Sequence, residues 1–82
     1  MKCEHINKGT CSRRVTFEID ANGLLHNVCF EGGCPGNTTG VAILCEGRRA
    51  AEVASMLRGT DCRGRGTSCP DQLARGIEEA LA

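Results

Sequence analysis

The sequence predicts an α+β fold, in which an antiparallel β-hairpin or a three-stranded sheet is covered by about three helices. In residues 15–19 and 25–30, apolar and polar side chains alternate, which is the pattern of half-buried strands. In the second half of the chain, apolar side chains recur at helical spacing between glycines. We expect residues 1–82 to form one domain with a thin aliphatic core, because the chain has only two aromatic residues.

The hairpin is the best-defined element of the predicted sheet. Residues 20–23 (Asp-Ala-Asn-Gly) separate the two alternating segments, and Asn22 and Gly23 both tolerate a positive φ. Residues 15–19 and 25–30 are therefore expected to pair as antiparallel neighbours. The polar segment 2–7 is compatible with a short edge strand beside them.

The turn also sets which residues face each other across the hairpin. With the turn centred between Asn22 and Gly23, opposed residues have numbers that sum to about 45. Cys11 and Cys34 satisfy this sum, and directly opposed residues have Cβ atoms roughly 4.5–5.5 Å apart. That separation suits two thiolates that share a metal, or a disulfide after a small adjustment.

Three helices are predicted after the glycine-rich segment 32–36. The first runs over 37–46 or 38–46 and ends before a glycine, and the second occupies 49–58. The third, from Ser68 or Cys69 to the end of the chain, has Pro70 at its first position and an aliphatic residue at every fourth position.

Composition limits the classes of function. Seven cysteines in a chain that opens on polar residues, without a signal peptide, are typical of a reducing cytosol, so we expect a cytoplasmic protein. Ten basic and ten acidic side chains cancel, which gives no reason to expect a nucleic acid partner. No apolar stretch is long enough to span a bilayer, so no membrane is expected either.

Cys11, Cys34, Cys62 and Cys69 are the candidate metal ligands. The first two are opposed in the predicted hairpin, and the third lies in the glycine-rich loop 59–67. The fourth lies at the start of the last helix, where free N–H groups and the helix dipole stabilise an anion. Zn²⁺ and iron–sulfur clusters are the occupants that soft thiolates select. The spacing lacks the C-x-x-C knuckle of the best-known zinc sites.

The remaining cysteines and the histidines are interpreted as structural. Cys45 falls on the apolar stripe of its helix and is expected to be a small buried hydrophobe. Cys29 is out of phase with its apolar neighbours and is expected to pack under a helix on the other sheet face. Cys3 and His5 are assigned to a mobile terminus, and His26 to solvent.

Residues 67–71 spell Thr-Ser-Cys-Pro-Asp, and on this motif the chain resembles the TSCPD domain family. Gly-Gly-Cys-Pro-Gly-Asn at 32–37 and Thr-Cys-Ser at 10–12 match the other landmarks of the family, so the likeness covers almost the whole chain. The family comprises small stand-alone bacterial proteins and a C-terminal domain of cobalamin-dependent ribonucleotide reductases. The resemblance implies metal or iron–sulfur binding at the same four cysteines. Members are often labelled ribonucleoside-diphosphate reductase, but this chain is too short for that catalytic barrel, which implies an accessory role.

A more distant likeness is to the U-type iron–sulfur scaffold proteins, the IscU and NifU group. There, three cysteines hold a nascent [2Fe–2S] cluster at positions that match the candidate ligands other than Cys62. The scaffolds have an aspartate where this chain has Arg13 and a histidine where it has Ser68. With Cys62 as a fourth ligand the site would be closed, which is typical of structural or electron-storing centres.

The function predicted is therefore a small module that holds Zn or an iron–sulfur cluster, accessory to ribonucleotide reduction and without catalysis of its own. Its expected partner is a ribonucleotide reductase or an iron–sulfur assembly protein. The alternative is a thiol–disulfide protein that donates electrons to a ribonucleotide reductase through the pairs Cys11–Cys34 and Cys62–Cys69. A third interpretation is a partner-binding domain whose cysteines are incidental. The sequence leaves the metal and the oligomeric state open.

Overall fold

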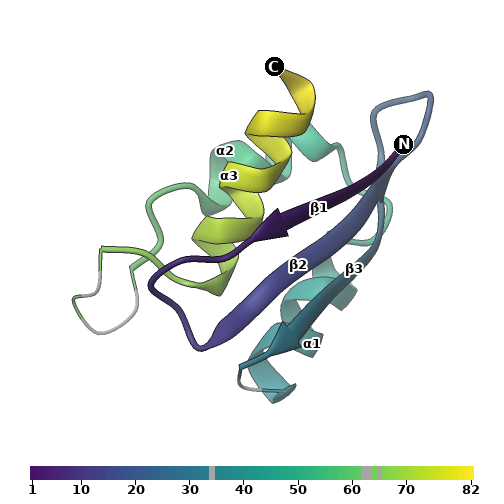
Figure 1. The fold of residues 1–82 in the computed structure, drawn as a ribbon. Helices are drawn as coiled ribbons and strands as arrows, with labels where there is room; N and C mark the ends of the chain where they lie inside the picture. The colour runs from purple at the N-terminus through teal and green to yellow at the C-terminus, as the bar shows by residue number, and fades with distance from the viewer. Residues whose placement is uncertain (34, 62–63, 65) are drawn as a thin grey trace.

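The computed structural model describes residues 1–33, 35–61, 64 and 66–82. The elements run in the order β1 (Lys2–Ile6), β2 (Ser12–Ile19), β3 (Leu25–Gly32), α1 (Pro35–Cys45), α2 (Ala50–Leu57) and α3 (Cys69–Leu81). The strands form an antiparallel sheet in the order β1-β2-β3. Helix α1 packs against β3, α3 packs against β1 and β2, and α2 packs on α3, so the helices lie behind the sheet in Figure 1. The predicted α+β fold class is confirmed.

The hairpin register agrees with the prediction in the middle of the strands and changes at both ends. Val15 pairs with Phe30 and Thr16 with Cys29, so the residue numbers sum to 45. Towards the turn, β3 accommodates one extra residue in a bulge, where Asn27 has a φ of 56°. Towards the open end of the hairpin, the register shifts by one residue at Arg13.

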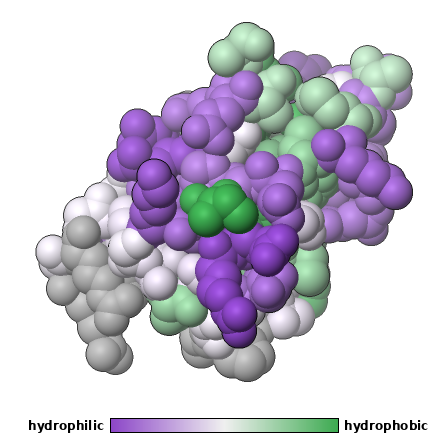
Figure 2. Space-filling model, in the orientation of Figure 1, coloured by the Kyte–Doolittle hydropathy of each residue, from purple (hydrophilic) through white to green (hydrophobic). Residues whose placement is uncertain are grey.

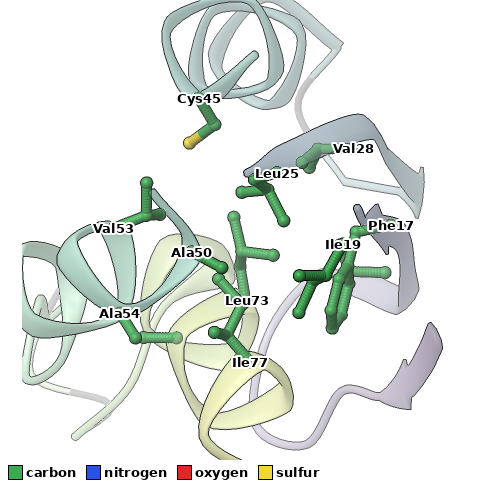
Figure 3. Packing of buried hydrophobic residues seen from close by; sticks show 12 residues of the cluster. Phe17, Ile19, Leu25, Val28, Cys45, Ala50, Val53, Ala54, Leu73 and Ile77 are labelled. Carbon is green, nitrogen blue, oxygen red and sulfur yellow. The ribbon is translucent and has the colours of Figure 1, made fainter. Parts of the chain in front are cut away.

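The core lies between the sheet and the helices. It is built from side chains of β2, β3 and all three helices, with Leu73 of α3 near the centre of Figure 3. The buried members are Val15, Phe17, Ile19, Leu25, Val28, Cys45, Ala50, Val53, Ala54, Leu73, Ala74 and Ile77. Burial raises the pKa of the Cys45 thiol, which therefore stays neutral, and its predicted role as a small hydrophobe is confirmed.

The opposite face of the sheet is open to solvent. Figure 2 shows mainly hydrophilic residues over much of the view in which the sheet lies in front. Arg14 joins the three strands there, through ion pairs of 2.8 Å to Glu4 and 3.0 Å to Glu31. Cys29, opposite Thr16 in the strand pairing, is exposed, so the expectation that it packs under a helix is wrong. In the described part of the chain, no helix is both long and apolar enough to cross a membrane.

His26 connects the hairpin turn to the end of α1, and the expectation of a solvated side chain is also wrong. Its Nε2 lies 2.8 Å from Asp20 Oδ2, and its Nδ1 contacts Glu46 Oε2. Hydrogen bonds to Glu46 and Asp20 raise the pKa of His26. Glu46 also accepts the N–H of Asn27 at 2.9 Å, which fixes the bulge to the helix.

We expect His26→Gln to remove a contribution to stability that depends on pH. The folded pKa of His26 is raised above the ordinary value of 6.5. The contacts of protonated His26 with Asp20 and Glu46 therefore stabilise the fold fully below pH 6.5, and this contribution is lost as the pH rises through the folded pKa. Urea unfolding between pH 6 and 9 should therefore show a smaller decline in the variant than in the wild type. Parallel pH profiles of the two proteins would contradict this assignment.

Gly76 marks the closest approach of α3 to the sheet. A Cβ at this position would lie 2.7 Å from the Cβ of His5 and 3.3 Å from an edge carbon of Phe17. We expect Gly76→Ala to destabilise the fold by about 1–3 kcal/mol, the usual cost of overpacking. Gly40→Ala is the matched control, because a Cβ there meets nothing within 4 Å, and it should stabilise α1 by up to about 1 kcal/mol. Equal unfolding free energies for the two variants would refute the close contact.

Candidate functional site

The site begins where α3 begins. Ser68 is the N-cap, with extended backbone angles, and its Oγ accepts the N–H of Asp71 at 3.1 Å. Pro70 occupies the first turn, where the helix needs no donor. Cys69 is thus the first helical residue, one position before the predicted first position at Pro70, and only 7% of its surface is exposed.

Asp71 holds this helix start in place. Its carboxylate has no exposed surface and accepts hydrogen bonds from Thr67 Oγ1, from the N–H of Gly59 at 2.7 Å and from Arg75 Nε at 2.8 Å. Burial on its own raises the pKa of this carboxyl, but these hydrogen bonds outweigh burial and lower the pKa to about 2. Gly59 follows α2, so the buried charge ties the end of α2 to the start of α3.

Gln72 extends the polar network to the N-terminal strand. Its Oε1 accepts from the N–H of Lys8 at 3.2 Å and lies 2.8 Å from His5 Nε2. Its Nε2 donates to Thr67 Oγ1 at 2.9 Å. His5 Nδ1 lies 2.8 Å from Glu79, so both ring nitrogens of His5 have partners and neither is available as a ligand in this arrangement. The expectation of a mobile terminus is wrong for this strand.

Cys69 also contacts the hairpin. Its Sγ lies 2.9 Å from Ser12 Oγ, and Ser12 is 2% exposed. Asn7 Nδ2 donates to the same Ser12 oxygen at 2.8 Å. The Oδ1 atom of Asn7 is buried and has no hydrogen-bond partner in the described part of the chain. Buried oxygens without a donor are uncommon, and a bound water or ion is one of their explanations.

Cys11 lies at the same end of the hairpin and is exposed. A Cβ on Gly33 would lie 3.4 Å from Cys11 Sγ and 3.2 Å from the Cβ of Ser12, so the glycine allows the chain to pass close to that sulfur. Gly33 also has a φ of 84°, which favours glycine over other residues. Cys34 is the next residue in the sequence.

The structure therefore brings Cys69 to the strand end that carries Cys11, with Ser12 between them. The other two predicted ligands, Cys34 and Cys62, lie outside the described residues. Over 1–33, 35–61, 64 and 66–82, no three His, Cys, Asp or Glu side chains are grouped to hold a metal, but these ranges contain only two of the four predicted ligands. The described cysteines are all free thiols.

Several residues of this site were not singled out by the sequence analysis. Ser12 and Asp71 stood only inside motifs, and Asn7 and Gln72 had no assigned role. The contacts of Ser12 with Cys69 and of Gln72 with His5 and Lys8 join residues 57 to 67 positions apart, so no local pattern reveals them. A capping serine followed by Pro70 and an acidic residue was the one local signal that pointed here.

These features define a small α+β domain with a cysteine site between a hairpin end and a helix start. A family model, the TSCPD domain, matches residues 1–81, and the chain belongs to this family. No curated protein and no solved structure matches the chain. The family assignment agrees with the resemblance found on the Thr-Ser-Cys-Pro-Asp motif, whereas the likeness to the scaffold proteins stays untested.

We expect Asp71→Asn to destabilise the fold by about 3 kcal/mol at pH 7, the lower end of the range for breaking a buried charge pair. The folded pKa is about 2 and the ordinary value is 3.8, so the carboxylate stabilises the fold fully above 3.8 and this contribution is lost as the pH falls through 2. Chemical unfolding between pH 7 and 2 should show the wild type and the variant converging in acid. A constant difference would show that the charge of Asp71 does not carry the effect.

Proposed function

We propose that the chain is a metal-binding module in which Cys11, Cys34, Cys62 and Cys69 hold Zn²⁺ or an iron–sulfur cluster. The observation that carries the proposal is the contact of 2.9 Å between Cys69 Sγ and Ser12 Oγ, because it joins the start of α3 to the residue next to Cys11. Two ligands that are 58 positions apart in sequence, 69 − 11, are thereby brought to one end of the fold.

The local chemistry supports a thiolate site. Cys69 lies at a helix N-terminus, where the backbone favours a negative charge, and its sulfur has a hydroxyl neighbour. Gly33 leaves room beside Cys11, and the unpaired oxygen of Asn7 lies on a residue that contacts Ser12. Thiolates of this kind select zinc and iron–sulfur clusters over hard cations.

A metal would stabilise the hairpin end and the start of α3, which lie outside the described hydrophobic core. The buried cluster lies between the sheet and the helices, whereas the hairpin end and the start of α3 meet through polar contacts. Metal bound to thiolates adds its binding free energy to folding, which matters most in chains of this size. If the occupant is a cluster, the site can also store an electron. Family membership favours an accessory role beside a ribonucleotide reductase, with an iron–sulfur assembly protein as the other candidate partner, in a reducing cytoplasm.

The second candidate is thiol–disulfide exchange. Its support is the exposed residue Cys11, which a partner could reach. In that function a pair of thiols would give two electrons and two protons to a disulfide of the partner and would itself become a disulfide. Such pairs would react freely with thiol reagents, whereas metal-bound thiolates are protected.

Metal analysis tests the proposal. We expect untagged protein purified under anaerobic conditions to contain zinc, or iron with visible charge-transfer absorption. Serine at Cys11, Cys34, Cys62 or Cys69 should lower the bound metal at least severalfold. Cys29→Ser is the matched control, because Cys29 is exposed on the open sheet face, and it should leave the metal content unchanged. Protein without metal, in which the same four thiols are oxidised reversibly, would replace this proposal with the redox function.

A further inference from the structure

We infer that Ser12, oriented by Asn7, is a positioning residue that donates a hydrogen bond to the Cys69 sulfur. This hydrogen bond strengthens metal binding and slows the release of the metal. The inference deepens the proposed function and rests on it. It concerns two residues that the sequence motifs do not mark as ligands, both on the hairpin side of the site.

Counting the available protons shows that the hydroxyl of Ser12 can donate to the Cys69 sulfur. Thr10 Oγ1 donates its only proton to the backbone oxygen of Ser12 at 3.0 Å, so it does not donate to Ser12 Oγ. Asn7 Nδ2 donates to Ser12 Oγ at 2.8 Å. The hydroxyl proton of Ser12 is left for Thr10 Oγ1 at 3.3 Å or for Cys69 Sγ at 2.9 Å, and the sulfur is the nearer acceptor.

An accepting sulfur is the form of Cys69 that binds metal. A thiolate has no proton to give, and a hydrogen bond to a charged acceptor is stronger than one to a neutral acceptor. The hydrogen bond from Ser12 would hold the Cys69 sulfur in a fixed orientation. Outer-sphere hydrogen bonds have the same effect on the ligands of known metal sites. Burial reinforces the effect, since Asn7, Ser12 and Cys69 are exposed to only 9%, 2% and 7%.

Asn7 orients the Ser12 hydroxyl towards Cys69, while one of its own polar atoms stays unpaired among the described residues. Its amide nitrogen satisfies Ser12, while its Oδ1 stays buried without a partner in the described chain. An unpaired buried acceptor destabilises the fold. The backbone N–H of Asn7 is bonded to the oxygen of Arg13 at 2.9 Å, so the residue is held across the loop between β1 and β2.

The two described ligands therefore differ in their surroundings. Cys69 is buried and hydrogen-bonded to Ser12, whereas Cys11 is exposed. A competing ligand from solvent would reach Cys11 more readily than Cys69. The hydroxyl of Ser12 would slow the departure of the metal from Cys69.

The test is competition for Zn²⁺ between the apo protein and a chromophoric chelator, with both the affinity and the release rate measured. We expect Ser12→Ala to lower the affinity 10–100-fold, the usual effect of losing an outer-sphere partner, and to speed release. Ser12→Thr keeps the hydroxyl and should recover most of the loss. Asn7→Asp, which removes the amide donor at nearly constant size, should weaken binding in the same direction. Ser55→Ala on the exposed side of α2 is the matched control and should change nothing.

The spectrum of the Co²⁺-loaded protein separates positioning from folding. Loss of a hydrogen bond to the sulfur shifts the sulfur-to-cobalt charge-transfer band, whereas a less stable fold lowers the amount bound without moving the band. If the wild type binds Zn²⁺ and Ser12→Ala binds and releases it equally, the inference is overturned and the metal site stands. If the wild type binds no Zn²⁺, Co²⁺ or iron, the proposed function fails and the inference fails with it.

Discussion

The buried carboxylate of Asp71 is the constraint on which the rest of the site depends. An ionised group without exposed surface is tolerated only when its oxygens are satisfied, and here Thr67, Gly59 and Arg75 satisfy them, with Arg58 at 3.6 Å. Thr67 precedes α3, Gly59 follows α2, and Arg75 lies one turn further along α3. The single charge of Asp71 therefore sets the positions of these three residues relative to one another. The Thr-Ser-Cys-Pro-Asp motif therefore has a structural explanation that does not involve a metal. It builds a helix start that places Cys69.

Two kinds of interaction divide the molecule. Aliphatic packing joins the sheet to the helices, and the large members of the core, among them Phe17 and Leu73, are almost completely buried. At the end of the hairpin where Ser12 meets Cys69, hydrogen bonds replace that packing. Such polar contacts add little net stability because they replace contacts to water, but they fix geometry. A small domain is held at that end by precise contacts rather than by buried area, which is the situation in which a bound metal contributes most.

Local patterns predicted what local physics determines. The alternation in β2 and β3, the cap and Pro70 of α3 and the burial of Cys45 are confirmed. The bulge at Asn27 and the partners of His26 were missed, because both depend on Glu46, which is 19 and 20 positions away. The same reason accounts for Ser12, whose partner Cys69 is 57 positions away. The joint role of the four cysteines stays a prediction, since two of them lie outside the described residues.

The surroundings of Cys69, one of the two described candidate ligands, fit the proposed metal binding better than disulfide exchange. Exchange needs a sulfur that a partner disulfide can approach in line, and Cys69 is 7% exposed with Ser12 against its sulfur. Cys11 is accessible, and Cys34, its partner in the predicted redox pair, lies outside the described residues. A metal ligand has the opposite requirements, because a buried and hydrogen-bonded thiolate binds more firmly than a solvated one. A buried Cys69 that would anchor a metal and an exposed Cys11 that would admit it are therefore consistent with the proposed metal site.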